Sequence, residues 1–282
     1  MPRIEISGVG IDYELLGEPI GRAVAITPGG RLSKDSPGVR EMGLAIADRG
    51  LRALIWDRPN CGASDLCFDG DSESKLHARV LTKLIRNLDL GPTVVVGGSA
   101  GARVSLFAAL YDPDVVSHLA LWWISGGLIS MMRLGSYYCC EPAVEASLKG
   151  MEAVAAMPIW AEQLKRNPRN REIMLSQDPQ EFTARMERWA AGYIPSETSP
   201  VGGITKEDFR RLAMPVMIFR GSPTDLFHPA SICEEVHALI PRSELVDAPW
   251  PDDIFAHRMR SGPGLFVDWP LLAPAIANFS AR

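Results

Sequence analysis

One stretch of the chain decides its fold: Val94-Val95-Val96-Gly97-Gly98-Ser99-Ala100-Gly101. The three valines predict a buried strand, and the apolar spacing from Arg103 to Leu110 predicts a helix directly behind the turn. A serine on such a sharp strand-to-helix turn needs small neighbours, because the backbone there is strained and tightly packed. Its hydroxyl would lie at the positive end of the following helix. We therefore interpret Ser99 as a nucleophile, in preference to a glycine-rich turn that only packs or binds phosphate.

Strands and helices alternate on both sides of this turn. A hairpin is expected over residues 3–16, and helices are expected over 39–48 and 74–88. Near-continuous apolar strands are expected at 23–26, 51–56, 94–96 and 115–124. Such strands are typical of a mostly parallel sheet that helices cover on both faces. The fold class predicted is therefore α/β.

The alternation stops after the sixth strand. Residues 125–206 have helical spacing, many aromatic side chains and six of the eleven methionines, and strand–helix alternation resumes at Pro215. We predict a helical cap over 125–206, inserted between two parts of one core, 1–124 and 207–282. Because methionine adapts to irregular shapes, we expect a roomy apolar pocket beneath the cap. A final helix is expected near 265–279.

The composition excludes several classes of protein. The 282 residues are 46% hydrophobic and 22% charged with a net charge of −5, which is typical of a globular protein. No Lys/Arg-rich block, no apolar run of membrane-spanning length and no signal-peptide pattern is found, so neither nucleic acid nor a membrane is an expected partner. Five scattered cysteines without a CxxC pair fit reduced thiols in the cytoplasm, with Cys139 and Cys140 free. A small-molecule substrate is expected, and a homodimer is left open.

A serine nucleophile needs a base, and the base needs an acid to orient it. Asp225 follows the strand at 215–219, and His257 follows the strand at 244–246. In this order of serine, acid and histidine the chain resembles the α/β-hydrolase superfamily over nearly its whole length. The resemblance implies a capped α/β-hydrolase fold in which Ser99 attacks, His257 is the base and Asp225 orients it.

Other residues compete for the base and acid roles. His228 lies three residues after Asp225, so we expect it to form a local hydrogen bond without reaching Ser99 across the acid. The remaining histidines, His77, His118 and His237, lie inside predicted helices or strands and are expected to be packed or solvated. Asp252 and Asp253 precede His257 and are the alternatives to Asp225.

Two further stretches support the resemblance. Thr27-Pro28-Gly29-Gly30-Arg31 occupies the place of the family's oxyanion loop. We expect the backbone N–H groups of Ala100 and Gly30 to stabilise the oxyanion, with Arg31 as the alternative to Gly30. The segment 57–64 resembles the family's D-x-x-G-x-G-x-S turn, with Asn60 at the first glycine, where asparagine tolerates a positive φ. Asp57 and Ser64 in this turn are expected to be structural.

The same residues limit the chemistry. A serine at position 99 argues against dehalogenases and epoxide hydrolases, which use a carboxylate there, and no metal-ligand pattern is found, so no cofactor is expected. The expected substrate is an apolar or aromatic ester, bound with the help of Arg31, Trp123 and Trp160. The alternatives are C–C bond hydrolysis of a ring-cleavage product, against which Gly98 counts, and a ligand receptor with little turnover.

Overall fold

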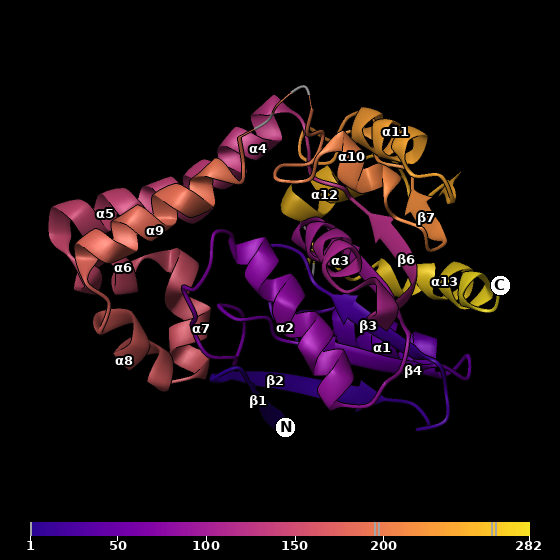
Figure 1. Cartoon of the computed structure of the whole chain (residues 1–282), viewed down its shortest axis with the longest axis horizontal. Helices are drawn as coiled ribbons and strands as arrows, with labels where there is room; N and C mark the ends of the chain where they lie inside the picture. The colour runs from indigo at the N-terminus through magenta and orange to yellow at the C-terminus, as the bar shows by residue number, and fades with distance from the viewer. Residues whose placement is uncertain (1, 195, 197, 261, 263) are drawn as a thin grey trace.

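The computed structural model describes residues 2–194, 196, 198–260, 262 and 264–282 (Figure 1). Its centre is an eight-stranded sheet with the order β1-β2-β4-β3-β5-β6-β7-β8. The strands are β1 (Arg3–Ile6), β2 (Val9–Leu16), β3 (Ala23–Thr27), β4 (Arg52–Trp56), β5 (Thr93–Gly98), β6 (Val116–Trp122), β7 (Val216–Phe219) and β8 (Ser243–Val246). Of the strand pairs described in this sheet, β1–β2 and β2–β4 are antiparallel and the other five are parallel. The predicted α/β class and the hairpin are confirmed.

Helices cover both faces of the sheet because successive strand residues point to opposite sides. On β5, Val95 packs into one core cluster, whereas Val94 and Val96 pack into the other. The first cluster is closed by α2 (Glu73–Asn87), α3 (Ala100–Tyr111), α10 (Lys206–Arg210) and α11 (Ala230–Leu239). The second is closed by α1 (Val39–Ala47), α12 (Ile254–Arg260) and α13 (Ala273–Ser280).

The helices between β6 and β7, apart from α10, project from one end of the sheet (Figure 1). They are α4 (Leu128–Gly135), α5 (Glu141–Lys149), α6 (Met151–Ala156), α7 (Ala161–Arg166), α8 (Arg169–Leu175) and α9 (Pro179–Ala191). A π-helical turn at Ser136–Cys140 joins α4 to α5. These helices enclose a third apolar cluster, which also takes in Leu66 and Phe68 from the core. We call residues 125–206 the cap, and its boundaries remain a prediction.

The chain end differs from the expectation. The predicted helix over 265–279 is wrong in its first half, since a 3₁₀ turn at Trp269–Leu272 precedes α13. Pro270 and Pro274 explain the break, because proline donates no backbone hydrogen bond. Cys139 and Cys140 are both free thiols, as expected. Within the described residues no helix is long and apolar enough to cross a membrane.

Candidate active site

Ser99 lies in a strained turn between β5 and α3. Its backbone has φ +56° and ψ −122°, outside the regions that non-glycine residues favour. A side chain at Gly97 would place its Cβ only 2.5 Å from the carbonyl carbon of Gly101, so the turn closes only without one. The Ser99 N–H donates to the carbonyl oxygens of Trp122, the last residue of β6, and of Trp123 at 3.2 and 3.1 Å. The predicted sharp turn is confirmed.

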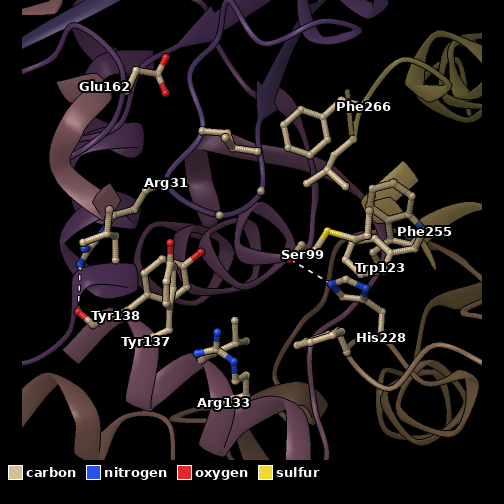
Figure 2. Close-up of a pocket in the computed structure, with 18 of the residues that line it drawn as sticks. Arg31, Ser99, Trp123, Arg133, Tyr137, Tyr138, Glu162, His228, Phe255 and Phe266 are labelled. Carbon is tan, nitrogen blue, oxygen red and sulfur yellow. Dashed lines mark hydrogen bonds between the residues drawn. The ribbon is translucent and has the colours of Figure 1, made fainter. Parts of the chain in front are cut away.

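Two hydrogen bonds connect Ser99 to a buried carboxylate through an imidazole. The Nε2 atom of His228 lies 3.0 Å from Ser99 Oγ, and Nδ1 lies 2.8 Å from Oδ2 of Asp225. The side chains of His228 and Asp225 are only 2% and 3% exposed. This is the serine–histidine–carboxylate arrangement of triad hydrolases, and Figure 2 shows the Ser99–His228 contact.

The histidine in this position is not the one that we predicted. His257 is an exposed residue of α12, and our expectation that His228 could not reach Ser99 is wrong. The cause is a tight turn in which Asp225 Oδ1 accepts the backbone N–H groups of Phe227 and His228 at 2.8 and 3.2 Å. The chain therefore doubles back, and the imidazole stands between the carboxylate and the serine.

Among the described residues, the carboxylates between β8 and α12 lie at the surface. Asp252 and Asp253 are exposed. Trp250 is directed inward, with its ring 5.6 Å from that of Trp123. Asp225 thus lies where the resemblance placed the acid, but His228 takes the place predicted for His257.

Burial and hydrogen bonding act oppositely on Asp225. Burial raises its pKa, but the hydrogen bond and charge of His228, with the two backbone N–H groups, outweigh burial and hold the pKa below the ordinary value. The carboxylate is therefore ionised at neutral pH. Trp123 stacks on the imidazole at 5.9 Å and Phe255 meets it edge-on at 4.5 Å, which fixes the ring.

The predicted oxyanion loop lies against the serine. A Cβ added at Gly29 would be 3.1 Å from Ser99 Cβ, and Gly30 adopts the left-handed φ of +51°. The buried Arg58 donates from Nη2 to the carbonyl oxygens of Gly29, Gly30 and Leu32 at 3.3, 2.8 and 3.3 Å. Ala100 is the first residue of α3, where backbone N–H groups lack intrahelical acceptors.

A cavity of about 500 Å³ opens beside Ser99 (Figure 2). Most of its lining is apolar or aromatic, and the residues are Gly29, Gly30, Arg31, Leu32, Ser99, Trp123, Arg133, Leu134, Tyr137, Tyr138, Pro158, Ile159, Glu162, Gln163, Phe227, His228, Phe255, Met259, Leu265 and Phe266. Of the predicted substrate-binding residues, Arg31 and Trp123 line it. Trp160 is fully buried and packs behind Arg31. Cap and core thus both contribute walls.

Arg31 links the cap to the oxyanion loop. Its guanidinium lies 4.1 Å from the Trp160 ring and 5.0 Å from the Tyr138 ring, and its Nε donates to Glu73 at 3.0 Å. Its backbone oxygen accepts a hydrogen bond from Gln163 of the cap at 3.1 Å. Sequence reasoning did not identify Glu73 or the role of Tyr138, because their contacts join segments far apart in the chain.

The side chains of the turn at 57–64 form hydrogen bonds that hold the backbone, as the sequence predicts for structural residues. Asn60 has φ +66°, as its place at a glycine position predicts. The buried Asp57 accepts the backbone N–H groups of Lys34 and Ala63, and Ser64 Oγ donates to the Asp57 carbonyl. Among the described residues no group of three His, Cys, Asp or Glu side chains could hold a metal ion.

Comparisons with known sequences match only part of the chain. No protein-family model matches it. A segment of 77 residues is 36% identical to a 2-hydroxy-6-oxononadienedioate/2-hydroxy-6-oxononatrienedioate hydrolase of Burkholderia vietnamiensis. The segment makes up 27% of this chain and 27% of that protein. The Escherichia coli protein of that name is 32% identical over 76 residues. The match thus spans about a quarter of these relatives' length.

Comparisons with solved structures cover the whole chain. A hydrolase from Pseudomonas aeruginosa aligns over 100% of this chain and 98% of its own, with a TM-score of 0.65 and 17% identity. An enol-lactonase from Burkholderia xenovorans covers both chains fully, with a TM-score of 0.61 and 17% identity. An esterase from Thermogutta terrifontis covers 88% of this chain and 90% of its own, with a TM-score of 0.56 and 20% identity. The chain has the α/β-hydrolase fold.

Proposed function

We propose that this chain is a serine hydrolase in which Ser99 is the nucleophile, His228 the base and Asp225 the orienting acid. The observation that carries the proposal is the pair of hydrogen bonds from Ser99 through His228 to Asp225, at 3.0 and 2.8 Å. A buried imidazole with a carboxylate on one nitrogen and a serine on the other is suited to moving a proton.

The proton path follows from the hydrogen bonds. Ionised Asp225 accepts the Nδ1–H of His228, which leaves the Nε2 lone pair directed at the Ser99 hydroxyl. As Ser99 Oγ bonds to the substrate carbonyl carbon, its proton passes to Nε2. The imidazolium then protonates the leaving alcohol, and the ester bond breaks to give an acyl-enzyme. Water, deprotonated by the same nitrogen, releases the acid and restores Ser99.

The negative charge on the substrate oxygen needs donors on the other side of Ser99. The backbone N–H groups of Ala100 and Gly30 are our candidates, with Arg31 as the alternative to Gly30. The contacts of Arg58 with three carbonyl oxygens support a fixed loop there. Such fixed donors do not have to reorganise as the charge develops.

The cavity supports an apolar or aromatic ester as substrate. Trp123, Phe255, Phe266 and Ile159 give it apolar walls, and apolar walls bind hydrocarbon groups by removing their surface from water. The names of the partly matching relatives raise C–C bond hydrolysis of a ring-cleavage product as a second candidate. That reaction would use the same serine and imidazole.

Two measurements test the proposal. Wild-type protein should hydrolyse nitrophenyl acetate, butyrate or benzoate, and Ser99→Ala should lower kcat by about 10⁶, the loss found when a triad serine is removed. Ser125→Ala is the matched control, because Ser125 Oγ lies 3.5 Å from Ser99 Oγ. Ester turnover that survives Ser99→Ala would contradict the proposal, and turnover of dienones in place of esters would favour the second candidate.

A further inference from the structure

A hydrogen bond from the cap holds the turn that carries the base. Ser130, in the first turn of α4, is only 1% exposed, and its Oγ donates to the carbonyl oxygen of Phe227 at 2.9 Å. Phe227 directly precedes His228, so this carbonyl belongs to the peptide group that leads into the base. The cap is thereby attached to the backbone from which the imidazole departs.

The peptide group between Phe227 and His228 is held at both of its polar atoms. Its N–H, that of His228, donates to Asp225 Oδ1 at 3.2 Å, and its carbonyl oxygen accepts the hydroxyl proton of Ser130. A trans peptide group is planar, so bonds on its two opposite edges stop the plane from rotating about the line between its Cα atoms. The Cα of His228 lies at one end of that line. The direction in which the imidazole leaves the chain therefore depends on Ser130.

The other backbone hydrogen bonds of this segment do not replace that contact. The N–H of Ala230 donates to the Ser222 carbonyl at 3.2 Å, which closes the segment on itself, and the bonds to Asp225 also lie inside it. Among the described residues, Ser130 is the donor from another element that reaches the backbone of residues 222–229. Its loss would leave this backbone attached through its own contacts alone.

Two glycines bring α4 against the element that follows the base. A Cβ added at Gly126 would lie 2.8 Å from side-chain atoms of Ile232 in α11, so a side chain there would push the two elements apart. Gly127 then leads the chain into α4 with a φ of +76°, in the region that glycine tolerates. The close approach that allows the Ser130 hydrogen bond is thus set by the residues just before the helix.

We propose that Ser130 is a positioning residue for the base, which holds the peptide group of Phe227 and His228 so that Nε2 stays in line with Ser99 Oγ. The proposal rests on the proposed function and adds a residue of the cap to its machinery. Arg133 and Leu134 lie one helical turn after Ser130 and line the 500 Å³ cavity. The helix that forms a wall of the substrate cavity therefore also aligns the group that accepts the proton.

The test removes the hydroxyl of Ser130. Ser130→Ala should lower kcat for a nitrophenyl ester by roughly 10-fold, near the upper end for one hydrogen bond, because a rotated imidazole is less often in line with the serine. Labelling by a fluorophosphonate should slow by the same factor, since it needs the same proton transfer. KM should hardly change, because Ser130 does not line the cavity and its contribution is made in the reacting complex.

Ser199→Ala is the matched control. Ser199 is also a buried serine of the cap, and its Oγ donates to the carbonyl oxygens of Val201 and Ile204 at 2.9 and 2.7 Å. None of these three residues lines the cavity. Ser199→Ala should therefore lower the free energy of unfolding at least as much as Ser130→Ala does, and yet keep the wild-type kcat.

Proton NMR reads the position of the base without turnover. The proton between His228 Nδ1 and Asp225 Oδ2, which lie 2.8 Å apart, is in a short hydrogen bond to a charged group, and such protons resonate at low field. Ser130→Ala should shift this resonance, because a rotated peptide group changes the distance between the two atoms. Ser199→Ala should leave it in place.

Several outcomes would overturn the proposal. They are a wild-type kcat in Ser130→Ala, an unchanged resonance in that variant, a loss confined to KM, or an equal loss of kcat in Ser199→Ala. If Ser130→Ala does not fold, Ser130→Cys takes its place, since a thiol is a weak donor. A shifted resonance in a protein that hydrolyses no ester would uphold the positioning of His228 and refute the hydrolase, whereas esterase activity that Ser130→Ala leaves intact would do the reverse.

Discussion

The segments that follow β7 and β8 leave neighbouring parallel strands at the same edge of the sheet, yet their contents differ. The segment after β7 carries both Asp225 and His228, buried and hydrogen-bonded to each other. The segment after β8 carries exposed carboxylates and the inward-facing Trp250. The comparison teaches that the imidazole at Ser99 comes from the same segment as its carboxylate partner, so the histidine's distance along the chain does not decide which one faces the serine.

The largest expected difference between the two segments is in the loss of kcat when a histidine of each is replaced. His228→Ala should lower kcat by about 10⁶, as the loss of a triad histidine does, because no other group would take the Ser99 proton. His257→Ala should stay within a few-fold of wild type, since His257 is an exposed residue of α12. Steady-state kinetics with a nitrophenyl ester check both variants. The reverse ranking would show that the segment after β8 supplies the base.

Replacing the orienting acid should lower kcat less than replacing the base does. Asp225→Asn should lower kcat by about 10⁴, because an amide facing Nδ1 favours the wrong imidazole tautomer. Asp252→Asn should change kcat less than two-fold, roughly the scatter of an exposed substitution. Equal losses in the two variants would contradict the assignment of Asp225.

Asp225 should also contribute stability in a predictable pH range. Its folded-state pKa lies below the ordinary value, so the contribution is present above the unfolded-state pKa and is lost as the pH falls through the folded-state pKa. Wild type should therefore have a higher free energy of unfolding than Asp225→Asn at neutral pH, and the difference should shrink in acid. Urea unfolding across this range measures it, and a difference that grows in acid would be contrary to the account.

The smallest expected effect on kcat comes from Trp123, the ring that packs against the His228 imidazole. Trp123 stacks on His228, and an aromatic pair is worth about 0.5–1.5 kcal/mol. Trp123→Leu removes the aromatic ring and should lower kcat by about 2- to 12-fold and shift the pH profile of kcat. Trp250→Leu removes the neighbouring ring, which does not stack on His228, and should leave the pH profile unchanged. A loss confined to KM would assign Trp123 to substrate binding alone.

Local patterns explain which parts of the molecule were predictable. The valines of β5 and the small residues around Ser99 specify a buried strand and a sharp turn by themselves, so their prediction needed no distant contact. Asn60 was predictable in the same way, because its φ of +66° depends on the turn in which it lies.

The choice of base depended on geometry that the pattern does not contain. Whether His228 faces Ser99 is decided by the side-chain hydrogen bonds that Asp225 makes two and three residues on. Asp225 with His228 three residues later was the available signal, but the family resemblance places the histidine after the last strand, which pointed to His257. Glu73 was not predictable either, because its hydrogen bonds to Arg31 and Asn60 join segments far apart in the chain.

Labelling by a fluorophosphonate tests the central claim most directly, because it reports whether the serine is activated without requiring the natural substrate. Wild type and His257→Ala should each take up one equivalent, which peptide mapping would locate at Ser99, whereas His228→Ala and Ser99→Ala should remain unlabelled over the same time. Labelling of His228→Ala at the wild-type rate, or its loss in His257→Ala, would contradict the account.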